Sequence, residues 1–127
     1  MPVGLSDLPD HSLMELLSEF TSWSGYAGYV VAEATVAVRR ANRVLSRVAD
    51  AATVRLKAKT VAETKALVAQ TPEYIEAEDA LDEAENYEIL VKSYYTHLEA
   101  CAKTVSRELT RRTSRTNIEE RNGKYNT

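Results

Sequence analysis

The sequence predicts an all-α protein organised as a long antiparallel helical hairpin, with short N-terminal and connecting helices. Only four Gly and three Pro occur in 127 residues, which is too little turn material for a many-stranded β fold. Two long segments carry apolar residues at alternating spacings of three and four, the period of one helix face. Apolar residues also lie on other sides of these segments, so we expect several copies to assemble into a homo-oligomer.

Composition sets bounds on the class of protein. The length predicts one helical domain covering residues 1–127. The net charge of −3 hides strong charge patterning, so it does not exclude a nucleic-acid partner. A single cysteine excludes a disulfide framework or a multi-thiolate metal site within one chain. Because no signal peptide and no long apolar run is found, we expect a cytoplasmic protein without a membrane partner.

The second long helix is predicted over residues 72–115. Thr71 is suited to cap its N-terminus, and Pro72 is suited to the first helical position. Cys101 lies on the apolar stripe, where we expect a buried thiol. The stripe consists of Tyr74, Ala77, Leu81, Ala84, Tyr87, Val91, Tyr94, Leu98, Cys101, Val105 and Leu109. At about 1.5 Å per residue this helix spans roughly 65 Å and needs a partner of similar length.

The first long helix is predicted over residues 12–59, after a loose lead-in at 1–10. Ser12 and Glu15 have the spacing of a capping box. Gly25 and Gly28 predict either a kink near residue 25 or a continuous helix that another helix approaches closely. Its expected stripe is Ala27, Val30, Ala34, Ala37, Ala41, Val44, Val48 and Ala52.

A short connecting helix is predicted over residues 60–70, because Thr60 and Glu63 form a second capping box. Residues 116–127 are expected to be a frayed tail. Eight acidic residues and no Lys or Arg lie between Glu73 and Glu88. In an antiparallel hairpin this acidic segment lies beside the basic part of the first helix, so the charges favour that orientation.

Residues suited to catalysis or metal binding are scarce. His11 and His97 lie far apart, and neither has a second His or Cys at ligand spacing. No Gly-x-Ser-x-Gly motif and no Gly-rich phosphate loop is present. We therefore expect no enzyme activity, no metal and no cofactor.

Three stretches resemble the UvsY-type recombination mediators of tailed phages, over about residues 26–112. They are a Tyr-led, Ala/Arg-rich helix that ends in Val-Arg-Leu-Lys-Ala-Lys at 54–59, the acidic Pro-Glu-Tyr-Ile-Glu-Ala at 72–77, and a long helix that ends in basic residues at 105–112. The resemblance implies a ring-forming helical protein, located in the host cytoplasm if phage-encoded. Such a protein binds single-stranded DNA and loads a recombinase onto strands coated by single-strand-binding protein. A Lys-x-Arg pair of that family maps onto Lys57 and Lys59, with Lys in place of Arg.

Two basic tracks could meet DNA phosphates, because phosphate contacts supply most non-specific affinity. The candidate DNA-binding residues are Arg39, Arg40, Arg43, Arg47, Arg55, Lys57, Lys59, Arg107, Arg111 and Arg112. The first track lies opposite the apolar stripe, and half of it could be neutralised by the acidic segment. The second lies near a helix C-terminus, where it also complements the helix dipole. The leading hypothesis is a recombination mediator. The alternative is a non-catalytic helical adaptor or assembly protein that acts through protein contacts.

Overall fold

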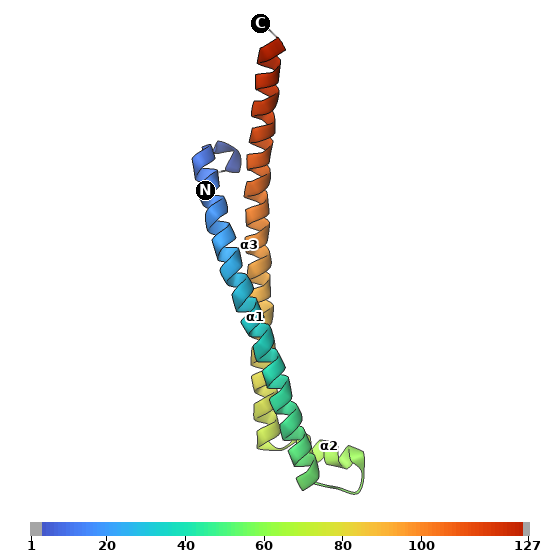
Figure 1. The fold of residues 1–127 in the computed structure, drawn as a ribbon. Coiled ribbons are helices and arrows are strands. Elements are labelled where there is room, and N and C mark those ends of the chain that lie inside the picture. Colours follow the sequence, from blue (N-terminus) through green and yellow to red (C-terminus); the bar gives the residue numbers. More distant parts are fainter. Residues whose placement is uncertain (1–3, 126–127) are drawn as a thin grey trace. The chain divides into compact units, whose positions relative to one another are not determined.

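The fold is all-helical in a computed structural model that describes residues 4–125 (Figure 1). Within these residues a 3-10 turn, η1 (Leu5–Asp7), precedes three α-helices and no strand occurs. The helices are α1 (Asp10–Arg55), α2 (Val61–Ala69) and α3 (Pro72–Tyr125). The two long helices pack against each other, which confirms the prediction of an all-α fold with two long helices. Assembly into a homo-oligomer stays a prediction.

The chain divides into two compact units, and one helical domain over residues 1–127 stays a prediction. Unit 1 combines the residues up to Ala27 with those from Tyr94 onward, that is, the first part of α1 and the later part of α3. Unit 2 is Gly28–Ser93 and contains the rest of α1, all of α2 and the first part of α3. Both long helices therefore contribute to each unit.

In unit 2 the two long helices run antiparallel. The Thr35 hydroxyl of α1 donates a hydrogen bond to the Glu88 carboxylate of α3. Further along α1, Arg55 Nη2 lies 3.9 Å from Glu73 Oε2. Residue numbers thus rise along α1 while they fall along α3, which is the orientation that the charge pattern predicted.

A seam of buried and half-buried residues joins these helices in unit 2. Its positions alternate in steps of three and four, the heptad spacing of coiled coils. On α1 they are Val31, Ala34, Val38, Ala41, Leu45, Val48 and Ala52; on α3 they are Tyr74, Ala77, Leu81, Ala84, Glu88 and Val91. The many Ala and Val side chains are small, which allows the helices to approach closely.

Unit 1 continues the same spacing with larger side chains. Its seam contains Leu13, Leu17, Phe20, Ser24 and Ala27 on α1, and Tyr95, Leu98, Ala102, Val105, Leu109 and Arg112 on α3. Leu13 is 0% exposed and Val105 is 2% exposed. Arg112 Nη1 donates to Asp10 Oδ1 at 2.8 Å, so these helix segments are also antiparallel.

The sequence-based stripes were wrong by one residue at several positions. Glu88, Tyr95 and Ala102 occupy the seam where Tyr87, Tyr94 and Cys101 were expected. On α1, the seam has Val31, Val38 and Leu45 in place of Val30, Ala37 and Val44. At five of these six positions the expected residue and the adjacent seam residue are both apolar, and a strict alternation of three and four decides between them.

Helix starts follow local capping chemistry only in part. The Thr60 hydroxyl accepts a hydrogen bond from the Glu63 N–H at 3.1 Å, which confirms Thr60 as the N-cap of α2. Thr71 Oγ1 accepts from the Tyr74 N–H at 3.4 Å, and α3 begins at Pro72 as predicted. The first helix, however, begins at Asp10 and not at Ser12, because the Leu13 N–H already donates to the Pro9 carbonyl.

Two further boundaries differ from the prediction. The first helix is continuous through Gly25 and Gly28, and it ends at Arg55 rather than at residue 59. The third helix continues to Tyr125, so the frayed tail predicted from residue 116 is wrong for residues 116–125; residues 126–127 lie outside the described part. The Thr116 hydroxyl bonds to the Arg112 carbonyl and Arg115 pairs with Glu119, so local i to i+4 contacts support this polar helix.

Candidate nucleic-acid interface

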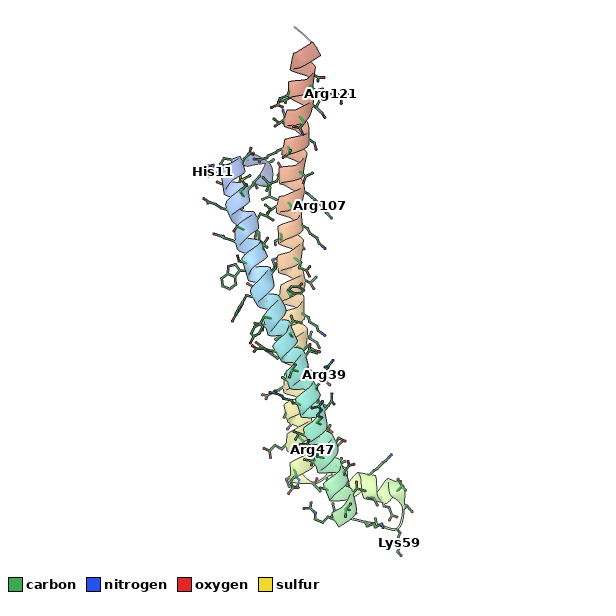
Figure 2. The ribbon with its side chains drawn as sticks, in the orientation of Figure 1. His11, Arg39, Arg47, Lys59, Arg107 and Arg121 are labelled. Atoms are coloured by element: carbon green, nitrogen blue, oxygen red, sulfur yellow. The ribbon has the colours of Figure 1, made fainter. Side chains whose placement is uncertain are left out.

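Four arginines form the outward face of α1 in unit 2, opposite the seam at helical spacing; Figure 2 labels two of them, Arg39 and Arg47. They are Arg39, Arg40, Arg43 and Arg47, and all four are exposed. Among residues 4–125 none of them forms an ion pair with a carboxylate. We call this set the α1 arginine face. A row of unpaired guanidinium groups on one helix is suited to bind phosphates.

Three lysines surround the turn between α1 and α2. Lys57 and Lys59 lie in the turn and Lys65 lies on α2, and all three line a pocket of about 480 Å³. The turn is held by the Ala58 N–H, which donates to Thr64 Oγ1 at 3.1 Å, and by the Thr60 cap. This lysine cluster adds Lys65 to the two lysines named from the sequence. The capping box at Thr60 was the signal that could have found Lys65, because it fixes where α2 begins.

The acidic segment of α3 forms no ion pair with any member of the α1 arginine face in the described chain. Arg55, another candidate DNA-binding residue, does pair with this segment: its Nη2 lies 3.9 Å from Glu73 Oε2, and both side chains remain more than half exposed. Glu88 faces the seam, where the Thr35 hydrogen bond and Lys92 lower the pKa of its carboxyl. The other acidic side chains between Glu73 and Glu88 are exposed and lack an ion pair within the described chain.

The second basic track is partly engaged within unit 1. Arg111 Nη2 lies 2.7 Å from Glu108 Oε1, and Arg112 Nε lies 3.0 Å from the same atom. Arg112 also donates to Asp10 and to the carbonyls of Leu5 and Ser6. Hydrogen bonds from Arg111 and Arg112 lower the pKa of Glu108 to about 2. Arg112 therefore fastens the N-terminal segment to α3, and we leave it out of the proposed DNA contact. Arg107 is exposed and forms no ion pair with the described residues.

Exposed aromatic residues were not part of the predicted site. Trp23 is 56% exposed and Tyr26 is 61% exposed, and their rings meet edge to face with centroids 6.1 Å apart. Both lie on α1 in unit 1, outside the seam. Exposed aromatic rings can stack on unpaired bases. The sequence signal for their exposure was that Trp23 and Tyr26 lie outside the three-and-four spacing of the seam.

Groups suited to catalysis or metal binding are sparse in the described chain. His97 Nε2 lies 3.6 Å from Cys101 Sγ, and Cys101 is half-buried rather than buried as expected. Residues 4–125 contain no group of three His, Cys, Asp or Glu side chains placed to hold a metal ion. Over the same residues, no helix has both the length and the apolar character needed to cross a membrane.

Comparison of the chain with protein-family models, with curated proteins and with solved structures found no match.

Proposed function

We propose that this protein is a homo-oligomeric recombination mediator that binds single-stranded DNA and helps to load a recombinase, without chemistry of its own. The observation that carries the DNA-binding part is the α1 arginine face, which has four exposed guanidinium groups and no carboxylate partner within the described chain. The lysine cluster at the α1–α2 turn lies beyond Arg55 on the same unit. The mediator role, and the recombinase and single-strand-binding protein as partners, are supported by the resemblance to UvsY-type proteins.

Physical chemistry favours a single strand bound through its backbone. Each Lys or Arg that neutralises a phosphate releases counterions, and the resulting affinity depends on salt and not on sequence. One protomer offers few such contacts and has a net charge of −3, so its own affinity is expected to be low. Several protomers on one strand multiply the contacts through effective concentration.

A salt-titrated binding assay tests the DNA-binding part. Fluorescence anisotropy with a labelled oligothymidylate should show tight binding at low salt. The logarithm of the association constant should fall linearly with the logarithm of the salt concentration, by about 0.7 per phosphate contact. In Lys57→Ala/Lys59→Ala and in Arg43→Ala/Arg47→Ala, both the affinity and this slope should decrease. Arg121→Ala, in unit 1 and outside both tracks, is the matched control and should bind like the wild type.

Absence of binding at low salt would contradict the proposal and favour the adaptor function. Exposed apolar side chains in unit 2 are the observation that supports this second candidate, among them Ile89 at 64% and Leu90 at 68% exposure. An adaptor should retain its protein contacts when Lys57 and Lys59 are replaced. In an adaptor these charges would affect the choice of partner and not the strength of binding.

A further inference from the structure

Unit 2 exposes apolar side chains on both long helices at the same level. On α1, Val36 is 43% exposed; on α3, Tyr87 is 52%, Ile89 is 64% and Leu90 is 68% exposed. The hydrogen bond between Thr35 and Glu88 joins the immediate sequence neighbours of these residues, so the two patches lie at the same level along the helices of unit 2. The α1 patch is hollowed by a shallow groove of about 570 Å³, lined by Tyr29, Ala32, Glu33, Val36, Ala37 and Arg40.

The part of unit 2 between the Thr35–Glu88 contact and the Arg55–Glu73 ion pair adjoins these apolar patches and is charged. The charges have opposite signs on the two helices. Between these limits α1 carries the α1 arginine face. Over the same span α3 carries exposed carboxylates, and we call this set the α3 acidic face: Glu76, Glu78, Asp79, Asp82, Glu83 and Glu85.

The spacing of the two charged faces also matches. Arg40, Arg43 and Arg47 follow one another at three and four residues, and so do Glu76, Asp79 and Glu83. Each triplet therefore forms one short stripe on the outer side of its helix. Because the two stripes lie on different helices of unit 2, one copy can present its arginines while another presents its carboxylates.

We propose that a second copy of this chain docks side by side in the same direction, with the α3 acidic face of one unit 2 on the α1 arginine face of the next. In this alignment the exposed Leu90 side of α3 meets the groove on α1, and opposite charges meet over the adjoining span. Docking in the reverse direction would place apolar side chains against charges. Docking of α1 on α1 would place arginine against arginine, which is repulsive. The inference rests on the oligomer contained in the proposed function. A docked neighbour occupies Arg40, Arg43 and Arg47, so DNA bound to the oligomer would contact Arg39 and the lysine cluster of Lys57, Lys59 and Lys65.

Charge reversal with rescue tests this interface in solution. Sedimentation equilibrium at low salt and without DNA should give the wild type a mass above that of one chain. The variant Arg40→Glu/Arg43→Glu/Arg47→Glu and the variant Glu76→Arg/Asp79→Arg/Glu83→Arg should each associate at least tenfold more weakly. An equimolar mixture of the two variants should recover association, because both contacts in the mixture again join opposite charges. Arg121→Glu, an exposed site in unit 1, is the control and should associate like the wild type.

A monomeric wild type, or reversed variants with wild-type mass, would overturn the proposed interface. Circular dichroism monitors the helix content of each variant. If a triple variant loses its helices, the exposed Leu90→Asn substitution takes its place and should also weaken association, while an unchanged mass would again overturn the interface. Anisotropy with the oligothymidylate on the same wild-type sample keeps the two proposals apart: an oligomer that binds no DNA rejects the mediator and leaves this interface standing.

Discussion

Ser24 places a hydroxyl group in the seam of unit 1. Its Oγ is buried and has no hydrogen-bond partner among the described residues. A buried polar group without a partner loses its hydration and gains nothing in return, at a cost of about 1–3 kcal/mol. Alanine is also the better helix former. Ser24 therefore makes the seam of unit 1 less stable than alanine would at the same position.

We therefore predict that Ser24→Ala raises the free energy of unfolding by about 1 kcal/mol, because it removes the unpaired hydroxyl. Urea denaturation followed by circular dichroism measures the change. Ser18→Ala is the control, since Ser18 lies on α1 in the same unit but is exposed, and only the small gain in helix propensity is expected there. Equal gains in the two variants would show that the hydroxyl of Ser24 finds a partner in solution.

Glu108 should make the stability of unit 1 depend on pH. Hydrogen bonds from Arg111 and Arg112 lower the pKa of its carboxyl from 4.5 to about 2. A carboxyl whose pKa is lower in the folded state contributes stability above its unfolded pKa, and this contribution is lost as the pH falls through the folded value. We predict that the melting temperature of the wild type exceeds that of Glu108→Gln above pH 4.5, and that the difference shrinks between pH 4.5 and about 2. A constant difference over this range would contradict the assignment.

At the scale of the helices, the sequence predicted those features that depend only on residues close together in the chain. The caps at Thr60 and Thr71 need only nearby residues, and these predictions were confirmed. The three-and-four periodicity found both long helices, but it placed their stripes one residue off at several positions. The start of α1 was predicted at Ser12 but lies at Asp10, where the Leu13 N–H already donates to the Pro9 carbonyl. The capping-box spacing of Ser12 and Glu15 also could not show that Arg112, a residue distant in sequence, holds Asp10.

For the candidate site, the sequence predicted the positions of the arginines on α1 but not which guanidinium groups are free of ion pairs. Helical periodicity alone placed Arg39, Arg40, Arg43 and Arg47 opposite the seam, and the structure has them there. The availability of each guanidinium group could not be predicted, because ion pairs are formed between side chains. Arg112 is 18% exposed and bound to Asp10, whereas neighbouring Arg111 is 53% exposed. Lys65 was missed because its place beside Lys57 depends on the direction of α2.

Gly25 offers a test of helix continuity. It lies within α1, and a Cβ atom added there meets no other atom within 4 Å. Glycine in a helix interior costs about 1 kcal/mol relative to alanine, so Gly25→Ala should raise the free energy of unfolding by about that amount. Gly123→Ala has equally open space near the end of α3 and should change the stability less. A loss of stability in Gly25→Ala would indicate that another chain approaches this position closely.

For the assembled molecule, the proposed interface should respond to salt. Its contacts are exposed charges, whose interactions are screened as the Debye length falls from about 10 Å at 0.1 M to about 3 Å at 1 M. We predict that the average mass measured by light scattering decreases as the salt concentration rises at fixed protein concentration. Because apolar contacts strengthen or persist at high salt, an increase in mass would indicate that the Leu90 patch, and not the charged faces, holds the copies together.

Every described side chain on α3 from Thr113 to Gly123 is exposed, so this segment contributes almost nothing to the packing of unit 1. It contains Arg115 and Arg121, which are cleavage positions for trypsin. In Lys57→Ala/Lys59→Ala, which lacks the tryptic sites of the exposed turn, brief digestion should remove the segment first, while the bond after Arg112 resists because its guanidinium is held by Asp10 and Glu108. The shortened product should melt at the same temperature as the intact chain, and its boundary would mark where the fold ends and a freely accessible helical extension begins.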